Sequence, residues 1–246
     1  MLFRSRFGLK EIDKEKQVVL EEIRMVQDDP EDLVQELHTG LVMGRHPLSR
    51  PILGQTETIA RLRRQDLLDY IETHYRPEEM VLAVAGNFDR RRLERTMART
   101  FGASRSSSPD GSRTRWPPAV CGGVRLKQKS LEQVHLCVGF KGIPAGHKDR
   151  YAAYVLNSVL GGSVSSRLFQ EVREKRGLAY AVFSSLSAYR DAGALTIYAG
   201  CANDAVGELI DVVVAELRRI KDERVADAEL RRSEEHTSEL QSHLNL

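Results

Sequence analysis

Two glutamates, Glu15 and Glu22, lie where a helix built from this sequence should be apolar. When residues 12–26 are wound as an α-helix at about 100° per residue, both acids fall on its apolar stripe. The apolar members of that stripe are Ile12, Val19, Ile23 and Val26. Glu21 points roughly the opposite way, where a solvated acid is expected. A buried ionised carboxylate is costly unless it is paired or coordinates a metal ion, so the two acids either form such a site or reach solvent at the edge of the stripe.

The composition limits the class of protein. The chain has 246 residues, 41% of them hydrophobic, which is enough for one large domain or two modest ones. Its 37 basic and 35 acidic residues nearly cancel, so the charge gives no reason to expect nucleic acid or an anionic membrane as a partner. No apolar run approaches the roughly 18 residues of a membrane-spanning helix. The widely spaced Cys121, Cys137 and Cys201 are expected to be small core residues rather than a disulfide framework or a zinc knuckle.

The first half of the chain has the pattern of several helices and one strand. We expect helices over residues 11–27, 31–43, 58–75 and 90–101, an ordered loop over 44–54 and a strand over 80–88. Pro30 suits the first position of the second helix, because its missing N–H would be unpaired there in any case. The continuous apolar run over residues 80–88 predicts a strand buried on both faces.

Strands and helices alternate in the second half. We expect strands over residues 124–130 and 134–143, helices over 151–160 and 167–176, a hairpin of strands 178–189 and 194–201, and an amphipathic helix over 204–221. Ser165 or Ser166 can cap the helix over 167–176, which Gly177 ends. This repeated layout predicts an α+β fold of two related domains, each a mainly antiparallel sheet with helices packed on it.

The predicted domains are residues 1–101 and 119–231, joined by a linker over 102–118 that is rich in serine, proline and glycine. Residues 232–246 do not fit this plan. From Arg232 to His243 the chain resembles the translation of a widely used sequencing adapter, so we expect a non-native tail of read-through; the alternative is a polar, frayed terminus. On either interpretation His236 and His243 are not candidate metal ligands.

Four stretches together resemble one known family. They are "EKQVVLEEI", "HPLSRPILG", "HYRPEEMVLAVAGNFD" and "SSRLFQEVREKRGLAYAVFSSLSAYRDAG". Each alone is a weak pattern, but in this order and spacing they resemble the pitrilysin/insulinase family of zinc metallopeptidases, with Ser49 where glycine is usual. The resemblance covers nearly everything from Met1 to about Arg231. It implies that residues 1–101 are the C-terminal part of a first, zinc-bearing peptidase domain and residues 119–231 the N-terminal part of a second, and we expect both domains to be truncated.

The resemblance implies roles for the two stripe acids. In this family two histidines of an inverted HxxEH motif bind one zinc ion, the motif's glutamate activates a water molecule, and a distant glutamate completes three protein ligands. Glu22 matches that distant ligand. Glu15 matches an acid that supports the site from outside the set of ligands, and it is a candidate catalytic residue in that sense.

The resemblance also singles out Arg173 and Tyr180. In the family an arginine and a tyrosine at this spacing contact the substrate backbone near the scissile carbonyl, where a fixed cation and a phenol can donate hydrogen bonds to a developing oxyanion. The alternative is that Arg173 is a surface helix residue and Tyr180 a core strand residue. Arg167 and Arg176 are the other arginines that could take the role given to Arg173.

No HxxEH occurs in the chain. Besides His236 and His243, the chain has five histidines: His38, His46, His74, His135 and His147. None of the five has a partner histidine at four-residue spacing. The ligand histidines are therefore absent, and we expect this polypeptide to have no peptidase activity alone.

The resemblance implies a fragment of a zinc-dependent metalloendopeptidase that hydrolyses peptide bonds through a zinc-bound water. Its substrate would be a peptide or unfolded protein, and it could pair as a homodimer or as a heterodimer with another family subunit. One alternative is a non-catalytic family subunit that binds peptide and pairs with an active partner. An unrelated α+β binding module is a further alternative, but it leaves the stripe acids unexplained. The sequence is compatible with either the cytoplasm or the periplasm.

Overall fold

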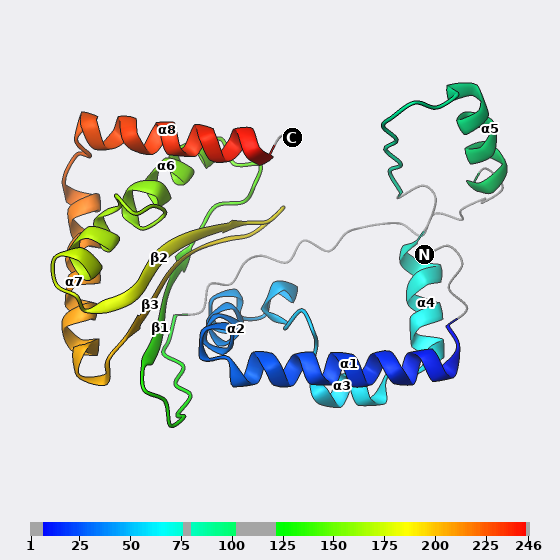
Figure 1. The fold of residues 1–246 in the computed structure, drawn as a ribbon, viewed down its shortest axis with the longest axis horizontal. Helices are drawn as coiled ribbons and strands as arrows, with labels where there is room; N and C mark the ends of the chain where they lie inside the picture. The colour runs from blue at the N-terminus through cyan, green and yellow to red at the C-terminus, as the bar shows by residue number, and fades with distance from the viewer. Residues whose placement is uncertain (1–6, 76–79, 102–121, 245–246) are drawn as a thin grey trace. The chain divides into compact units, whose positions relative to one another are not determined.

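Helices and an antiparallel sheet make up the structure, a computed structural model that describes residues 7–75, 80–101 and 122–244 (Figure 1). The helices are α1 (Leu9–Asp28), α2 (Pro30–Met43), α3 (Thr56–Arg61), α4 (Arg64–His74), α5 (Arg90–Phe101), α6 (Arg150–Leu160), α7 (Val206–Asp222) and α8 (Asp227–Leu244). The strands are β1 (Val134–Lys141), β2 (Ala179–Ala188) and β3 (Gly193–Cys201), and the short helical turns are η2 (Pro47–Ser49), η4 (Phe169–Glu174) and η5 (Asn203–Ala205). This mixture confirms the predicted α+β class. Within the described ranges, no helix is both long enough and apolar enough to cross a membrane.

The chain divides into two compact units. The first contains residues 1–23 and 53–114, and the second contains residues 24–52 and 115–246. All three strands belong to the second unit, whereas the described elements of the first are helical. The predicted linker over residues 102–118 lies outside the described residues. The predicted domains followed chain order, whereas residues 24–52 pack with the second unit; the domain boundaries stay a prediction.

The sheet of the second unit has the strand order β1–β3–β2, and both strand pairs are antiparallel. β2 and β3 form the predicted hairpin, with Ala188 paired to Gly193 next to the turn. In the central strand β3, Ile197 lies opposite Val138 of β1 and Ser184 of β2. Because strand side chains alternate between the two faces, every second residue of β3 points to the same layer of helices as Ile197.

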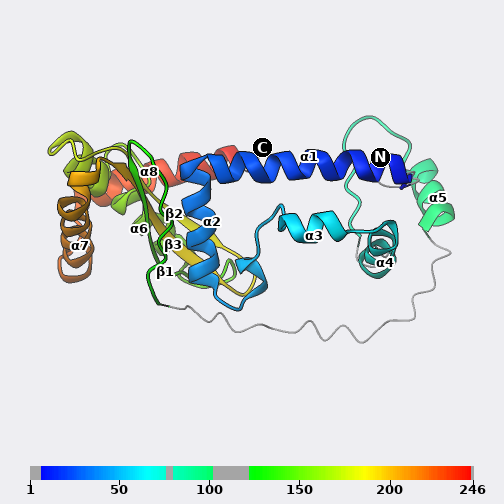
Figure 2. The ribbon, with the colours of Figure 1, turned by 90° about the horizontal axis from the view of Figure 1, so that it is seen from below.

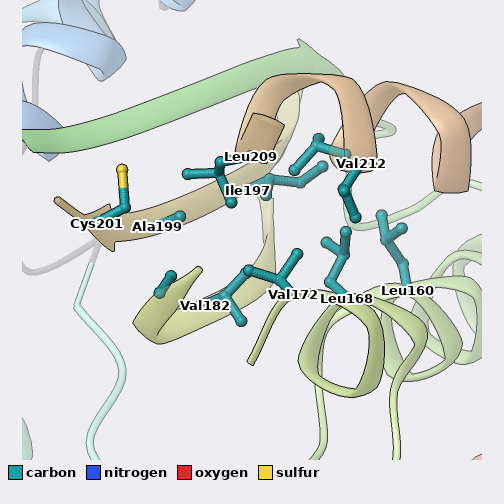
Figure 3. Close-up of a cluster of buried hydrophobic side chains, with 11 residues drawn as sticks. Leu160, Leu168, Val172, Val182, Ile197, Ala199, Cys201, Leu209 and Val212 are labelled. Carbon is teal, nitrogen blue, oxygen red and sulfur yellow. The ribbon is translucent and has the colours of Figure 1, made fainter. Parts of the chain in front are cut away.

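One face of this sheet packs against α6, η4 and α7 (Figures 1 and 3). The buried side chains of this main core are Leu160, Leu168, Val172, Ala179, Val182, Ile197, Ala199, Cys201, Leu209, Val212 and Val213. Leu168 and Val172 retain no exposed surface, and they hold η4 and the turn before it against the sheet. Each such side chain contributes about 1.5–3 kcal/mol when it is fully buried, so the position of η4 is strongly constrained.

The opposite face of the sheet is covered by α2 (Figure 2). Gly139 of β1 lies directly beneath His38, and a Cβ atom at this position would overlap the imidazole ring. A glycine is therefore needed for the close approach of α2 to β1. Asp29 starts α2 by accepting a hydrogen bond from the backbone N–H of Glu31 at 2.8 Å, and Pro30 takes the first helical position as predicted.

Two predicted strands are wrong. Residues 80–88 and 124–130 are not part of any sheet, and their apolar side chains are exposed, with Val81 at 95% and Val124 at 89% exposure. An apolar run identifies a strand only if neighbouring strands are present to pair with it. Among the described residues, the first unit supplies no strand that could pair with residues 80–88.

Two predicted helices are also corrected. The helix expected over residues 58–75 is divided into α3 and α4, and the carboxylate of Asp66 accepts a hydrogen bond from the Arg63 N–H at 2.7 Å at the start of α4. The helix expected over residues 167–176 widens into the π-helical turn η4. It begins without a serine cap, because the Ser166 hydroxyl is buried with no hydrogen-bond partner in the described part of the chain.

Helix α8 includes the segment predicted to be a non-native tail. It begins at Asp227, upstream of Arg232, and it packs against α6. A helical backbone does not test where those residues come from, so the adapter read-through stays a prediction. The anchor of α8 lies before the tail: the carboxylate of Glu229 accepts hydrogen bonds from Nε and Nη2 of Arg167, each at 2.8 Å.

Arg167 and Glu229 form a bidentate ion pair between α8 and the turn that leads into η4. The Arg167 side chain is only 10% exposed, so its charge is largely removed from water. Replacing Arg167 with glutamine should lower the unfolding free energy of the 246-residue chain by about 3 kcal/mol, because a partly buried carboxylate loses its partner. Urea unfolding followed by circular dichroism measures this loss.

Arg176→Gln is the matched control, because Arg176 shares Glu171 with Lys175, which stays in place. This exposed pair should contribute less than about 1 kcal/mol. The hydrogen bonds from Arg167 hold the pKa of Glu229 below its usual range, so the stabilisation is present above that range and is lost as the pH falls through the lowered value. Equal losses in Arg167→Gln and Arg176→Gln would contradict a structural role for the first pair.

Candidate functional site

The two acids of the opening stripe lie on α1 and are exposed, together with Glu21. Ile12 and Ile23 are buried as the helical pattern predicts, so the apolar stripe itself is real. The acids therefore lie at the edge of that stripe, which was the alternative to burial. Glu22 and Glu21 are both exposed, so exposure does not show which of them is the functional acid. The assignment of Glu22 rather than Glu21 stays a prediction.

Glu15 also lines an apolar cavity of about 600 Å³ in the first unit. Its walls come from α1, from Phe7 and Gly8, and from Ile59, Leu62 and Leu67. Lys16, which follows Glu15, donates hydrogen bonds from Nζ to the carbonyl oxygens of Ala60 and Leu62 at 2.8 and 3.1 Å. These bonds connect α1 with the end of α3 and shape one side of the cavity.

The carboxylate of Glu22 is a suitable zinc ligand but is insufficient alone. Zinc sites in enzymes use three protein ligands and leave one position open. Within the described residues, no three histidine, cysteine, aspartate or glutamate side chains are grouped so that they could hold a metal ion. The described residues therefore fit one part of a zinc site, and they do not complete it.

Most of the described histidines are engaged in the fold. Nδ1 of His46 accepts a hydrogen bond from the Leu48 N–H at 3.1 Å, and Nδ1 of His135 lies 2.9 Å from the Tyr198 hydroxyl. Burial lowers the pKa of His38, so its neutral form is favoured against Gly139. Packing and hydrogen bonding place these histidines in the fold, and among the described residues none of them belongs to a group of three possible metal ligands.

The described cysteines do not provide a nucleophile. Burial, with a smaller contribution from the Glu31 carboxylate, raises the pKa of the Cys137 thiol to about 12. Cys201 belongs to the main core, and burial raises its pKa as well. Because the thiolate is the reactive form, neither side chain is suited to covalent catalysis at neutral pH. Cys121 lies outside the described residues.

Arg173 and Tyr180 are brought together, although they come from different elements. Cζ of Arg173, on η4, lies 4.8 Å from the ring centroid of Tyr180 at the start of β2. The same Cζ lies 4.9 Å from the ring centroid of Phe169. Both distances are within the range of a cation–π contact. The guanidinium therefore contacts two aromatic rings.

The local sequence explains why Arg173 faces outward. Leu168 and Val172 are fully buried in the core, where Figure 3 shows both beside the sheet. Phe169 and Arg173 each follow one of these anchors by one residue, so they are displaced together toward the edge of the buried face. Tyr180 is 76% exposed, and the alternative that it packs in the core is wrong.

The neighbouring basic residues are paired with acids, whereas Arg173 has no acid partner among the residues that the structure describes. Arg167 binds Glu229, and Arg176 and Lys175 both bind Glu171. Lys175 and then Arg176 hold the pKa of Glu171 below its usual range. In the described part of the chain, Arg173 has no carboxylate partner and no hydrogen-bond acceptor. Arg167 and Arg176 are therefore engaged in ion pairs, whereas the guanidinium of Arg173 contacts rings and, among the described residues, no acid.

Phe169 was missed in the reasoning from sequence. Its signal was its position four residues before Arg173, a spacing that places side chains on the same side of a helix. Leu168 and Phe169 are adjacent apolar residues, so the sequence alone could not show which of them enters the core and which contacts Arg173. Only the packing shows that Leu168 enters the core and Phe169 contacts the arginine.

Comparison with known proteins identifies relatives of this chain. Residues 61–235 match the family model described as the peptidase M16 inactive domain. A protein of Bacillus subtilis named as the uncharacterized zinc protease YmxG is 41% identical over 236 residues, which cover 96% of this chain and 57% of that protein. The chain spans about half the length of the curated relatives it matches.

Solved structures share the fold at low sequence identity. The crystal structure of a peptidase M16 inactive domain from Pseudomonas fluorescens matches with a TM-score of 0.73 at 21% identity, over 96% of this chain and 57% of that one. A chain of complex III2 from Candida albicans matches with a TM-score of 0.80 at 21% identity, over 94% of this chain and 56% of that one. Both similarities concern the fold alone.

The incomplete ligand set leads to a prediction about metal binding. The untagged 246-residue chain should take up zinc only weakly, because the single carboxylate of Glu22 replaces the usual three protein ligands. Equilibrium dialysis at micromolar zinc should show no stoichiometric binding, and Glu22→Gln should change the residual uptake little. Tight binding of one zinc ion per chain would reveal ligands that the arrangement of the described side chains does not suggest.

Proposed function

The chain belongs to the M16 peptidase family, and from that premise we propose that it supplies one zinc ligand and the peptide-contacting residues of a zinc-dependent endopeptidase. The observation that carries this proposal is the arrangement of Arg173, whose guanidinium contacts two rings and has no acid partner within the described residues. A cation held in this way keeps its donors available for an oxygen of a ligand.

Arg173 and Tyr180 offer complementary donors for a peptide. The guanidinium presents several N–H donors in one plane, and the exposed Tyr180 adds a hydroxyl that can donate one hydrogen bond. Both suit the carbonyl oxygen of a peptide bond, particularly when negative charge develops on it. We assign the two residues to contact with the substrate backbone, and the substrate class is a peptide or unfolded protein.

Glu22 is proposed as a zinc ligand in the complete enzyme, together with histidines that this chain does not contain. Zinc in such a site supplies Lewis-acid activation of a water molecule. Glu15, seven residues before Glu22 and two turns away on the same side of α1, is assigned to hydrogen bonding that orients the site. Its place in the wall of an apolar cavity is consistent with a role beside other residues of the complete protein.

A second candidate function is a non-catalytic subunit of the same family, which binds peptide beside an active partner. It is favoured by the description of the matching family model as an inactive domain and by the fold shared with a chain of complex III2. The presence of HxxEH in the full-length protein would favour the peptidase, and its absence would favour the subunit. Either function could use Arg173 and Tyr180 for binding.

Glu22→Gln tests the proposed zinc ligand. In a full-length enzyme that carries this chain, the substitution should remove most of the bound zinc and most of the activity, because it replaces a charged ligand with a neutral amide. Glu15→Gln should lower activity by about 10- to 100-fold, as substitutions outside the ligand set typically do. Glu21→Gln is the matched control and should be mild; greater sensitivity at Glu21 than at Glu22 would reverse the assignment.

Tyr180→Phe and Arg173→Lys test the proposed contact with substrate. Tyr180→Phe removes only the hydroxyl and should lower kcat. Loss of one oxyanion donor costs about 100- to 1000-fold in other enzymes. The loss should be smaller here, because zinc carries part of the charge that develops on the carbonyl oxygen. Arg173→Lys should also be damaging, since an ammonium group cannot reproduce the planar fork of donors. Zinc content and melting temperature should stay almost unchanged.

Arg176→Lys is the control for this pair, because Arg176 is bound to Glu171 rather than available to a ligand. Its turnover rate should be close to that of the parent enzyme. A normal turnover rate in both Tyr180→Phe and Arg173→Lys would remove the support for the proposed substrate contact and leave Glu22 as the one chemical assignment.

A further inference from the structure

We propose that Phe169 is a positioning residue, which holds the guanidinium of Arg173 in the orientation that a peptide carbonyl needs. This inference rests on the proposed contact between Arg173 and substrate. The Arg173 Cζ atom is almost equally distant from the rings of Phe169 and Tyr180, at 4.9 and 4.8 Å. The ring of Phe169 therefore contacts the guanidinium as closely as the ring of Tyr180 does.

The geometry gives Phe169 a role that core packing does not explain. The buried positions around η4 are filled by Leu168 and Val172, whereas Phe169 remains partly exposed. Its ring contacts a cation that has no carboxylate partner in the described part of the chain. Arginine side chains have many rotamers, and contact with a ring restricts them at no cost in hydrogen-bond donors.

The same arrangement favours a particular ligand chemistry. A carboxylate partner would orient Arg173 equally well, but it would occupy the donors and neutralise the charge. Aromatic contacts restrict the guanidinium while its N–H groups remain free to bind oxygen. This arrangement is suited to the carbonyl oxygen of a peptide backbone, because such an oxygen is bound by directed hydrogen-bond donors and has no full charge to neutralise.

The π-helical form of η4 contributes to this placement. The Lys175 N–H donates to the Gln170 carbonyl at 3.0 Å, which is the i to i+5 bond of a widened turn. The widened turn begins directly after Leu168 and contains Val172, and it is followed by Gly177, whose φ of 62° ends the helix. Phe169 and Arg173 occupy the same short segment, so a rigid backbone carries both members of the contact.

Nuclear magnetic resonance on the 246-residue chain tests the contact without requiring activity. The Nε–Hε signal of Arg173, assigned by its loss in Arg173→Lys, should be shifted upfield by the neighbouring rings. Phe169→Leu should move it toward the position of an exposed arginine, whereas Phe169→Tyr should keep it in place. Phe183→Leu is the matched control, because Phe183 is also partly buried and stacks on Tyr198 at 4.9 Å, away from Arg173.

Kinetics on a full-length enzyme that carries this chain tests the consequence. Phe169→Leu should lower kcat/KM by up to about 100-fold, as expected when a reacting or binding group is displaced by about 1 Å. Phe169→Tyr should restore most of it, and Phe183→Leu should leave kcat/KM unchanged even if it lowers the melting temperature as much as Phe169→Leu does. A merely structural role would lower the melting temperature of Phe169→Leu and leave its kcat/KM intact.

The two proposals fail in different ways. Normal turnover in both Arg173→Lys and Tyr180→Phe would defeat the proposed substrate contact, whatever Phe169 does. Two results would overturn the positioning role alone. One is an Arg173 signal that stays at its wild-type position in Phe169→Leu. The other is a normal kcat/KM in Phe169→Leu while Arg173→Lys is impaired. A shifted signal with reduced kcat/KM, both recovered in Phe169→Tyr, is the result that we expect.

Discussion

The burial of Leu168 and Val172 against the sheet is the interaction on which the second unit depends. These two side chains bring η4 onto β2, and they complete the core that α6 and α7 share with the central strand. They also determine what lies outside that core, because Phe169 and Arg173 follow them by one residue each. A single packing requirement therefore stabilises the fold and exposes a cation beside the start of β2.

The sheet needs both of its faces covered, and the two layers use different chemistry. The face toward η4 is almost wholly apolar, whereas α2 places the polar His38 as well as the apolar Val42 and Met43 against the other. There Tyr198 of β3 is buried and contacts His135 at 2.9 Å, and burial together with Glu31 raises its pKa far above the usual range. The tyrosine therefore keeps its neutral hydroxyl at neutral pH, within hydrogen-bonding distance of the His135 ring.

Patterns within single elements were readable from the sequence, and contacts between distant elements were not. The hairpin of β2 and β3, the start of α2 at Pro30 and the helix of residues 90–101 agree with prediction, because each depends on turn chemistry or periodicity over a few residues. The predictions of strands over residues 80–88 and 124–130 were wrong, because a strand forms only where another strand, from elsewhere in the chain, pairs with it. The single helix expected over residues 58–75 was wrong, because a capping carboxylate at the start of α4 outweighed the continuous apolar pattern.

The candidate site divides in the same way. Helical spacing placed Glu15 and Glu22 on one stripe, but it could not show that they lie at its exposed edge. Family resemblance selected Arg173 from among three nearby arginines, and its role stays a prediction; the structure adds that the other two, Arg167 and Arg176, form ion pairs. Phe169 could have been suspected from its spacing to Arg173, but the ring contact requires the backbone of η4.

The charge partners around η4 separate the arginines that form ion pairs, Arg167 and Arg176, from Arg173, which has no acid partner in the described part of the chain. Removing an arginine from water is costly unless its charge is compensated, and Arg167 meets this condition through two hydrogen bonds to Glu229. Arg173 keeps contact with solvent and needs no compensation, so rings alone can orient it. Leaving it unpaired costs little stability while preserving its capacity to bind oxygen. A carboxylate placed beside it would add an ion pair of small value at the surface, but it would consume the donors that a peptide requires.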